Sequence, residues 1–224
     1  MSALHLLFAL LLAWPLQARY PRSPFVAKDA GATEAALMKV RAQTVAAVKG
    51  RDPVALSALM TADVRNWNSA LLEPGSVNGD TRWGELEMIL SQGGGFVERD
   101  GERRFCAPYA FAHYPKAPGE MSAELRELTE GDPWVVMGKD VRVHAAARRD
   151  SPIIGTLSDE LVELQDQDRP DESGARLIWQ WVFLPDGKNG YVLDRYVWSR
   201  DRKEHVCFSK RAGVWRITEL TDGA

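Results

Sequence analysis

The sequence has 224 residues, of which 45% are hydrophobic and 26% are charged, and this composition excludes disordered and fibrous classes. Its formal net charge is -3, with acidic and basic residues interspersed. No extended positive field is therefore available to collect phosphates, and nucleic acid is not expected as a partner. One or two compact domains are expected.

The N-terminus predicts export. An uncharged apolar run over residues 6–14 is followed by Pro15 and then by Leu16-Gln17-Ala18, a pattern typical of a secretory signal peptide. The run is shorter than the ~20 apolar residues that span a membrane, so a retained anchor is the weaker alternative. We expect a signal peptide over residues 1–18, a periplasmic or secreted protein, and no stable membrane insertion after cleavage.

Residues 19–31 contain two prolines and a glycine among charged residues, which is typical of a mobile linker. The next segment, 32–114, is expected to form an N-terminal domain. Helical periodicity predicts one helix that ends near Lys49, a second that begins with the cap Asp52 and with Pro53, and a third from about residue 80 to 90.

A β-hairpin is expected after these helices. Residues 96–99 and 103–111 have strand character and flank Asp100-Gly101, a dipeptide that supplies the positive φ angles of a hairpin turn. Pro108 makes the second strand an edge strand or places a bulge there. Residues 115–133 are rich in proline and glycine around a charged helical patch, so we expect a connector between domains.

Short strands separated by turn residues fill the segment 134–200, a spacing that favours a small β-barrel. A terminal hairpin is expected over residues 201–224, either on this barrel or returning to the N-terminal domain. The predicted fold class is therefore α+β: a helical N-terminal domain with a β-hairpin, then a small SH3-like β-barrel and a terminal β-hairpin.

Five short blocks carry a family resemblance: Val141-Arg142-Val143-His144, residues 151–157, Trp179-Gln180-Trp181-Val182, residues 185–192 and Tyr196-Val197. In order and spacing they resemble a bacterial SH3 (SH3b) domain. The resemblance implies a small barrel of exported proteins that binds peptidoglycan, a peptide or another protein. The family usually has Asn and Arg where this chain has Arg142 and His144, so the family's ligand contacts do not transfer directly.

A second resemblance covers the segment Ala46 to Val64, which is similar to the opening helices of NTF2-like (SnoaL-type) domains. In that family the closing strands resemble the segment Val206 to Ile217. The SH3-like segment would then be inserted before the last hairpin of the first domain. This resemblance implies the alternative function, a small-molecule binder or enzyme with a pocket in residues 32–114.

Chemical motifs point away from catalysis. The sequence contains no HExxH pair, no Cys-x-x-Cys, no G-x-S-x-G elbow and no P-loop. We therefore expect no catalytic residue, no metal site and no cofactor. The two cysteines, Cys106 and Cys207, are expected to form a disulfide because an exported chain permits pairing; two separate buried thiols are the alternative.

Aromatic side chains are dense in the SH3-like segment. Exposed aromatic faces bind sugars, peptides and partner chains, whereas buried ones would form the core of a small barrel. The candidate ligand-binding residues are Trp179, Trp181, Tyr191 and Tyr196. We expect a non-catalytic cell-envelope protein, not an enzyme, that recognises peptidoglycan or an envelope protein. The sequence leaves the ligand and the oligomeric state open.

Overall fold

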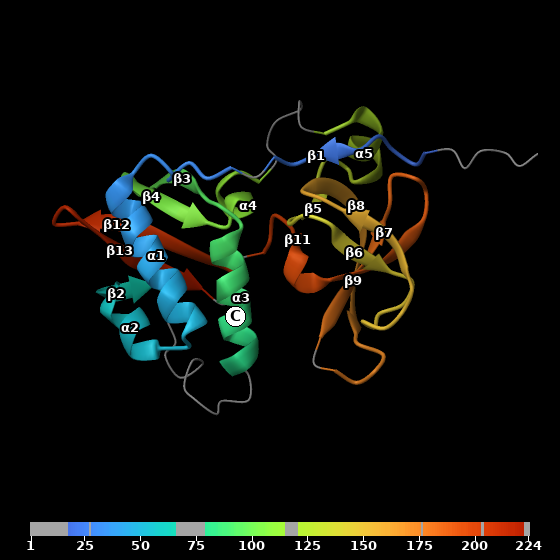
Figure 1. Cartoon of the computed structure of the whole chain (residues 1–224). Helices are drawn as coiled ribbons and strands as arrows, with labels where there is room; N and C mark the ends of the chain where they lie inside the picture. Colours follow the sequence, from blue (N-terminus) through green and yellow to red (C-terminus); the bar gives the residue numbers. More distant parts are fainter. Residues whose placement is uncertain are drawn as a thin grey trace, which may run out of the picture.

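The structure is a computed structural model that describes residues 18–26, 28–65, 79–114, 121–175, 177–202 and 204–221. Apart from Ala18, the expected signal peptide lies outside these ranges. Two β-sheets form two lobes that lie side by side (Figure 1). No helix in the described ranges is long and apolar enough to cross a membrane.

The N-terminal lobe is built on a five-stranded sheet with the order β2-β13-β12-β4-β3. The strands are β2 (Met60–Arg65), β3 (Gly95–Arg99), β4 (Glu102–Ala107), β12 (His205–Arg211) and β13 (Val214–Thr221). The pairs are antiparallel except β13 with β2, which is parallel. The terminal hairpin therefore belongs to this sheet, where β12 pairs with β4.

Three helices pack on one face of this sheet (Figure 1): α1 (Ala35–Lys49), α2 (Pro53–Ala58) and α3 (Gly79–Ser91). The local signals for them are confirmed, since α1 ends at Lys49 and the Asp52 side chain caps α2 by accepting from the Ala55 N–H. The hairpin turn is confirmed as well, with positive φ at Asp100 and Gly101. Apolar side chains fill the helix–sheet interface, among them Leu37, Ile89, Phe105, Phe208 and Ile217.

The second lobe contains the other sheet, with the order β11-β5-β8-β9-β10-β6-β7. Its strands are β5 (Trp134–Val136), β6 (Val141–His144), β7 (Ile153–Leu157), β8 (Glu160–Pro170), β9 (Ile178–Phe183), β10 (Asn189–Leu193) and β11 (Val197–Trp198). The short helices α4 (Tyr109–Ala112) and α5 (Ala123–Leu128) precede it, and a single 3₁₀ turn (Asp194–Tyr196) follows β10.

The predicted fold class is wrong in two respects. The structure is mostly β, with 40% strand and 25% helix, and the N-terminal lobe is a sheet covered by helices, not a helical domain. The second sheet is not a closed barrel: within the described residues, its end strands β7 and β11 do not pair with each other. The three predicted helices are present, but the helical character of the domain was overestimated. Helical periodicity is a local signal, whereas β2 pairs with a strand more than 150 positions away.

The segment expected as a mobile linker makes ordered contacts. Ser23–Pro24 forms the short strand β1, which pairs with β8, and Figure 1 shows this segment running along the second lobe before the chain enters α1. Tyr20 is 1% exposed, and its hydroxyl donates to the Phe183 carbonyl at 2.5 Å. The N-terminal segment thus contacts the second lobe before the chain forms the first. One apolar cluster includes residues of both lobes, such as Phe105 and Ile217 of the N-terminal lobe and Met137 and Trp198 of the second.

Candidate functional site

A cleft of about 410 Å³ opens in the second lobe where β6, β10 and the 3₁₀ turn meet. Four basic side chains line it, and they come from four different places: Lys139 from the turn before β6, Arg142 from β6, Arg149 from the loop after β6, and Arg195 from the 3₁₀ turn. Asp140 is the acidic residue in the same lining. The cleft is therefore strongly cationic although the chain as a whole is acidic.

Local backbone geometry explains how these side chains are displayed. Gly138 has a φ of +123°, a conformation that favours glycine, and its N–H donates to Asp159 Oδ1 at 2.7 Å. This turn places Lys139 at the rim of the cleft. Arg142 lies two residues before His144 on the same strand, so both side chains share one face of the sheet.

The cations of the cleft lack acidic partners. Lys139, Arg142 and Arg149 are exposed, and none of them forms an ion pair with any residue that the structure describes. The neighbouring Arg148 differs, because it pairs with Asp150 at 2.6 Å. Unpaired guanidinium groups gathered around a cleft can bind carboxylates or phosphates, both in bidentate geometry.

The floor of the cleft is a fixed aromatic pair. Trp179 is 1% exposed and its ring meets His144 edge-on, with ring centroids 5.1 Å apart. Its Nε1 donates to Asp171 Oδ2 at 2.8 Å. Hydrogen bonds from the Ser173 hydroxyl and from Trp179 hold the pKa of the Asp171 carboxyl below its usual value. Asp171 is therefore a carboxylate anion, and its hydrogen bond fixes the Trp179 ring.

The four predicted ligand-binding residues divide into two pairs. Trp179 and Tyr196 line the cleft. Trp181 and Tyr191 are directly paired across β9 and β10, are half-buried and do not line it. Because Tyr191 is also paired with His144, these aromatics share the sheet face on which the cleft opens.

The four cations were not predicted as site residues. Each is a single basic residue in a different element, so no run or motif in the sequence marks them. One signal was available: Arg142 stands where the resembled family usually has another residue. The residues chosen from the sequence therefore include two that line the cleft, Trp179 and Tyr196, and none of its four cations.

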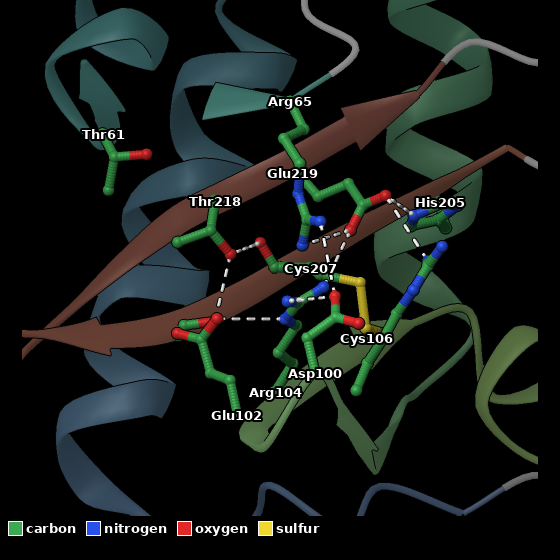
Figure 2. Close-up of polar contacts among 12 residues, drawn as sticks. Thr61, Arg65, Asp100, Glu102, Arg104, Cys106, His205, Cys207, Thr218 and Glu219 are labelled. Atoms are coloured by element: carbon green, nitrogen blue, oxygen red, sulfur yellow. Dashed lines mark hydrogen bonds and ion pairs between the residues drawn. A yellow bond between two sulfur atoms is a disulfide. The ribbon is translucent and has the colours of Figure 1, made fainter. Parts of the chain in front are cut away.

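A second polar cluster lies on the face of the N-terminal sheet opposite its helices (Figure 2). Cys207 of β12 is directly paired with Cys106 of β4 and with Glu219 of β13, so the three side chains share one face. The two cysteines form a disulfide with a Cα–Cα distance of 4.1 Å. The bond joins the terminal hairpin to β4 across a sequence separation of 101.

Glu219 is the centre of this cluster. Its side chain is 5% exposed, and its Oε2 lies 3.4 Å from Arg104, which is itself 4% exposed, and 3.5 Å from Arg65. The other oxygen, Oε1, lies 3.3 Å from His205 Nε2 and 3.8 Å from Arg99. Figure 2 shows these groups converging on the carboxylate. The buried charge of Glu219 is thus compensated from both sides.

The alternative pocket in residues 32–114 stays a prediction, because residues 66–78 of that range lie outside the described part of the chain. Comparisons with protein-family models, with curated proteins and with solved structures gave no match. The resemblances to bacterial SH3 and NTF2-like domains therefore also stay predictions, and function must be argued from the two clusters.

Proposed function

We propose that the protein is an exported, non-catalytic binding protein of the cell envelope whose second lobe recognises peptidoglycan. The observation that carries the proposal is the cleft in which Lys139, Arg142, Arg149 and Arg195 surround an aromatic floor without acidic partners. The stem peptides of peptidoglycan carry carboxylates, which arginine binds through paired, charge-assisted hydrogen bonds. The predicted signal peptide and the SH3-like sequence blocks support the same ligand.

Two other aromatic side chains, Trp181 and Tyr191, suit the glycan part of this ligand. Trp181 and Tyr191 present half-buried rings on the same sheet face, and rings with one accessible face pack well against sugars. Stem-peptide carboxylates would bind in the cationic cleft while the sugar lies against Trp181. Because the cations are exposed, the binding is expected to weaken as salt concentration rises.

Co-sedimentation with purified insoluble peptidoglycan tests the proposal. Reversing two charges of the cleft in Arg142→Glu/Arg149→Glu should weaken binding about tenfold, since each exposed pair contributes up to about 1 kcal/mol. Trp181→Ala should weaken it as well. Lys39→Glu is a control for charge reversal outside the cleft, because Lys39 is an exposed cation on α1 in the other lobe; this variant should bind like the wild type.

Two outcomes contradict the proposal. If the wild type stays in the supernatant, the ligand is not peptidoglycan, and capture of an envelope protein that depends on Arg142 would show that the cleft binds a protein instead. If incubation releases soluble muropeptides, the protein is catalytic. Equal weakening in Lys39→Glu would show a general effect of net charge, not recognition by the cleft.

A further inference from the structure

The disulfide, His205 and Glu219 meet at one point of the N-terminal sheet (Figure 2). We propose that this cluster is a redox-gated zinc site: once the disulfide is reduced, Cys106, Cys207, His205 and Glu219 bind one Zn²⁺. The inference is independent of the cleft in the second lobe. It also differs from the expectation of no metal site, which rested on motif spacing along the chain.

Geometry supports the ligand set. A ring nitrogen of His205, Cys207 Sγ and a carboxylate oxygen of Glu219 lie within 4.8 Å of one another. Cys106 is not part of that group of three, but its Sγ is bonded to Cys207 Sγ, so after reduction it is the neighbouring candidate for the fourth ligand. In a tetrahedral zinc site with bonds of about 2.0–2.3 Å, neighbouring ligand atoms are roughly 3.3–3.8 Å apart. Shifts of about an ångström would bring these three atoms to such distances, and the two sulfurs, now bonded, would have to move apart once their bond breaks.

Contacts around the ligands hold them in orientation. The His205 ring is stacked on Phe111, with centroids 3.8 Å apart and planes 14° apart. Arg104 and Arg65 lie nearest to Oε2 of Glu219, whereas Oε1 lies 3.3 Å from His205 Nε2 and, farther away, 3.8 Å from Arg99. One carboxylate oxygen is therefore held by an arginine while the other points to the proposed metal position, an arrangement in which an outer contact orients a ligand.

Charge explains why the site would bind metal in one redox state alone. In the oxidised state the disulfide is neutral, and Arg104, Arg65 and Arg99 around Glu219 oppose the entry of a cation. Two thiolates add a charge of -2, and Zn²⁺ adds +2. A zinc dithiolate thus replaces the disulfide without changing the net charge of a buried cluster.

The reaction requires a reductant, which we take to be a dithiol. The dithiol transfers two electrons and two protons to the disulfide, the S–S bond between Cys106 and Cys207 breaks, two thiols form, and the dithiol becomes a cyclic disulfide. Zn²⁺ then forms two Zn–S bonds, and the two thiol protons pass to solvent. In the reverse reaction the cyclic disulfide accepts two electrons from the two thiolates and two protons from solvent, the S–S bond between Cys106 and Cys207 forms again, and Zn²⁺ is released.

Metal titration of the full chain in both redox states tests the proposal, with Zn²⁺ for stoichiometry and Co²⁺ as a spectroscopic probe. Thiol titration first verifies two free thiols per reduced chain. We expect one metal ion per reduced chain, thiolate-to-cobalt charge-transfer absorption and a higher melting temperature with Zn²⁺. The oxidised chain should show none of these. His205→Ala and Glu219→Gln should weaken binding by more than the roughly 10- to 100-fold that loss of an outer contact costs.

His144→Ala is the control, because His144 lies in the other lobe; it should leave metal affinity unchanged. A reduced, folded chain with two free thiols and no bound metal would overturn the proposal. So would binding that persists at full affinity in Cys106→Ser/Cys207→Ser or in His205→Ala. If reduction unfolds the chain, Zn²⁺ must restore the native circular dichroism in the wild type and not in His205→Ala, and failure of that restoration also overturns it.

Discussion

Arginine is used in opposite ways in the two lobes. In the N-terminal lobe, Arg104 is buried on the sheet and faces the carboxylates of Glu219, Glu102 and Asp100. In the second lobe, Arg142 and Arg149 are exposed at a cleft and form no ion pair with any residue in the described ranges. A buried charge must be compensated within the fold, whereas an exposed and uncompensated cluster is free for a ligand. The comparison separates a structural network from a binding surface.

The two lobes also differ in how each holds its terminal segment in place. The terminal hairpin of the N-terminal lobe is fixed by a covalent bond across the sheet. The N-terminal segment is attached to the second lobe by noncovalent contacts alone. Strand β1 pairs with β8, Tyr20 is buried, and Arg19 forms an ion pair with Glu163 at 2.5 Å. Since the chain crosses between lobes several times and both contribute to one apolar cluster, we expect them to unfold together.

Removing the disulfide should have the largest effect on stability. A cross-link that closes a loop of this length stabilises by about 4–5 kcal/mol in the chain-entropy account. We expect a loss of that size for Cys106→Ser/Cys207→Ser, measured by urea unfolding. A loss below about 2 kcal/mol would contradict cooperative unfolding of the two lobes. If the second lobe stayed folded, less flexible chain would lie between the two cysteines, and the disulfide would remove less entropy from the unfolded state.

The second prediction compares the two uses of arginine directly. Glu219→Ala should cost about 3–5 kcal/mol in the free energy of unfolding, because it removes a buried partner of Arg104. Arg142→Ala should change stability by no more than about 0.5 kcal/mol, because it alters an exposed residue without an ion pair. Chemical unfolding of both variants measures the difference. Equal losses in the free energy of unfolding for the two variants would refute the distinction between a structural network around Glu219 and a binding surface at Arg142.

Local signals in the sequence were enough for part of this fold. Asp52 and Pro53 specify the start of α2, and Asp100-Gly101 specifies a hairpin turn, since each acts within a few residues. The strand character of β2 was missed because it depends on parallel pairing with β13. The strand β1 was missed in the expected linker for the same reason, since its partner β8 lies far along the chain.

The site was predictable to a similar degree. Aromatic density in the sequence led to the choice of Trp179 and Tyr196, which line the cleft, and equally of Trp181 and Tyr191, which do not. Spacing along the chain could not show that His205 and Glu219 lie beside Cys106 and Cys207, because strand register brings them together. Residues that act together across a sheet thus require the pairing of distant strands to be known first.

The smallest expected effect concerns the noncovalent attachment of the second lobe. Tyr20→Phe removes the hydrogen bond to the Phe183 carbonyl and should lower the free energy of unfolding by about 0.5–1.5 kcal/mol at neutral pH.

The effect of this substitution should depend on pH. Burial raises the pKa of Tyr20, so above pH ~10 the hydroxyl ionises in the unfolded state while it stays neutral in the folded state. The wild type should therefore lose stability relative to Tyr20→Phe as pH rises past 10, and the difference between them should shrink and then reverse. Urea unfolding at pH 7, 9 and 11 measures it. A constant difference would show that Tyr20 is accessible to solvent and that β1 does not hold the second lobe.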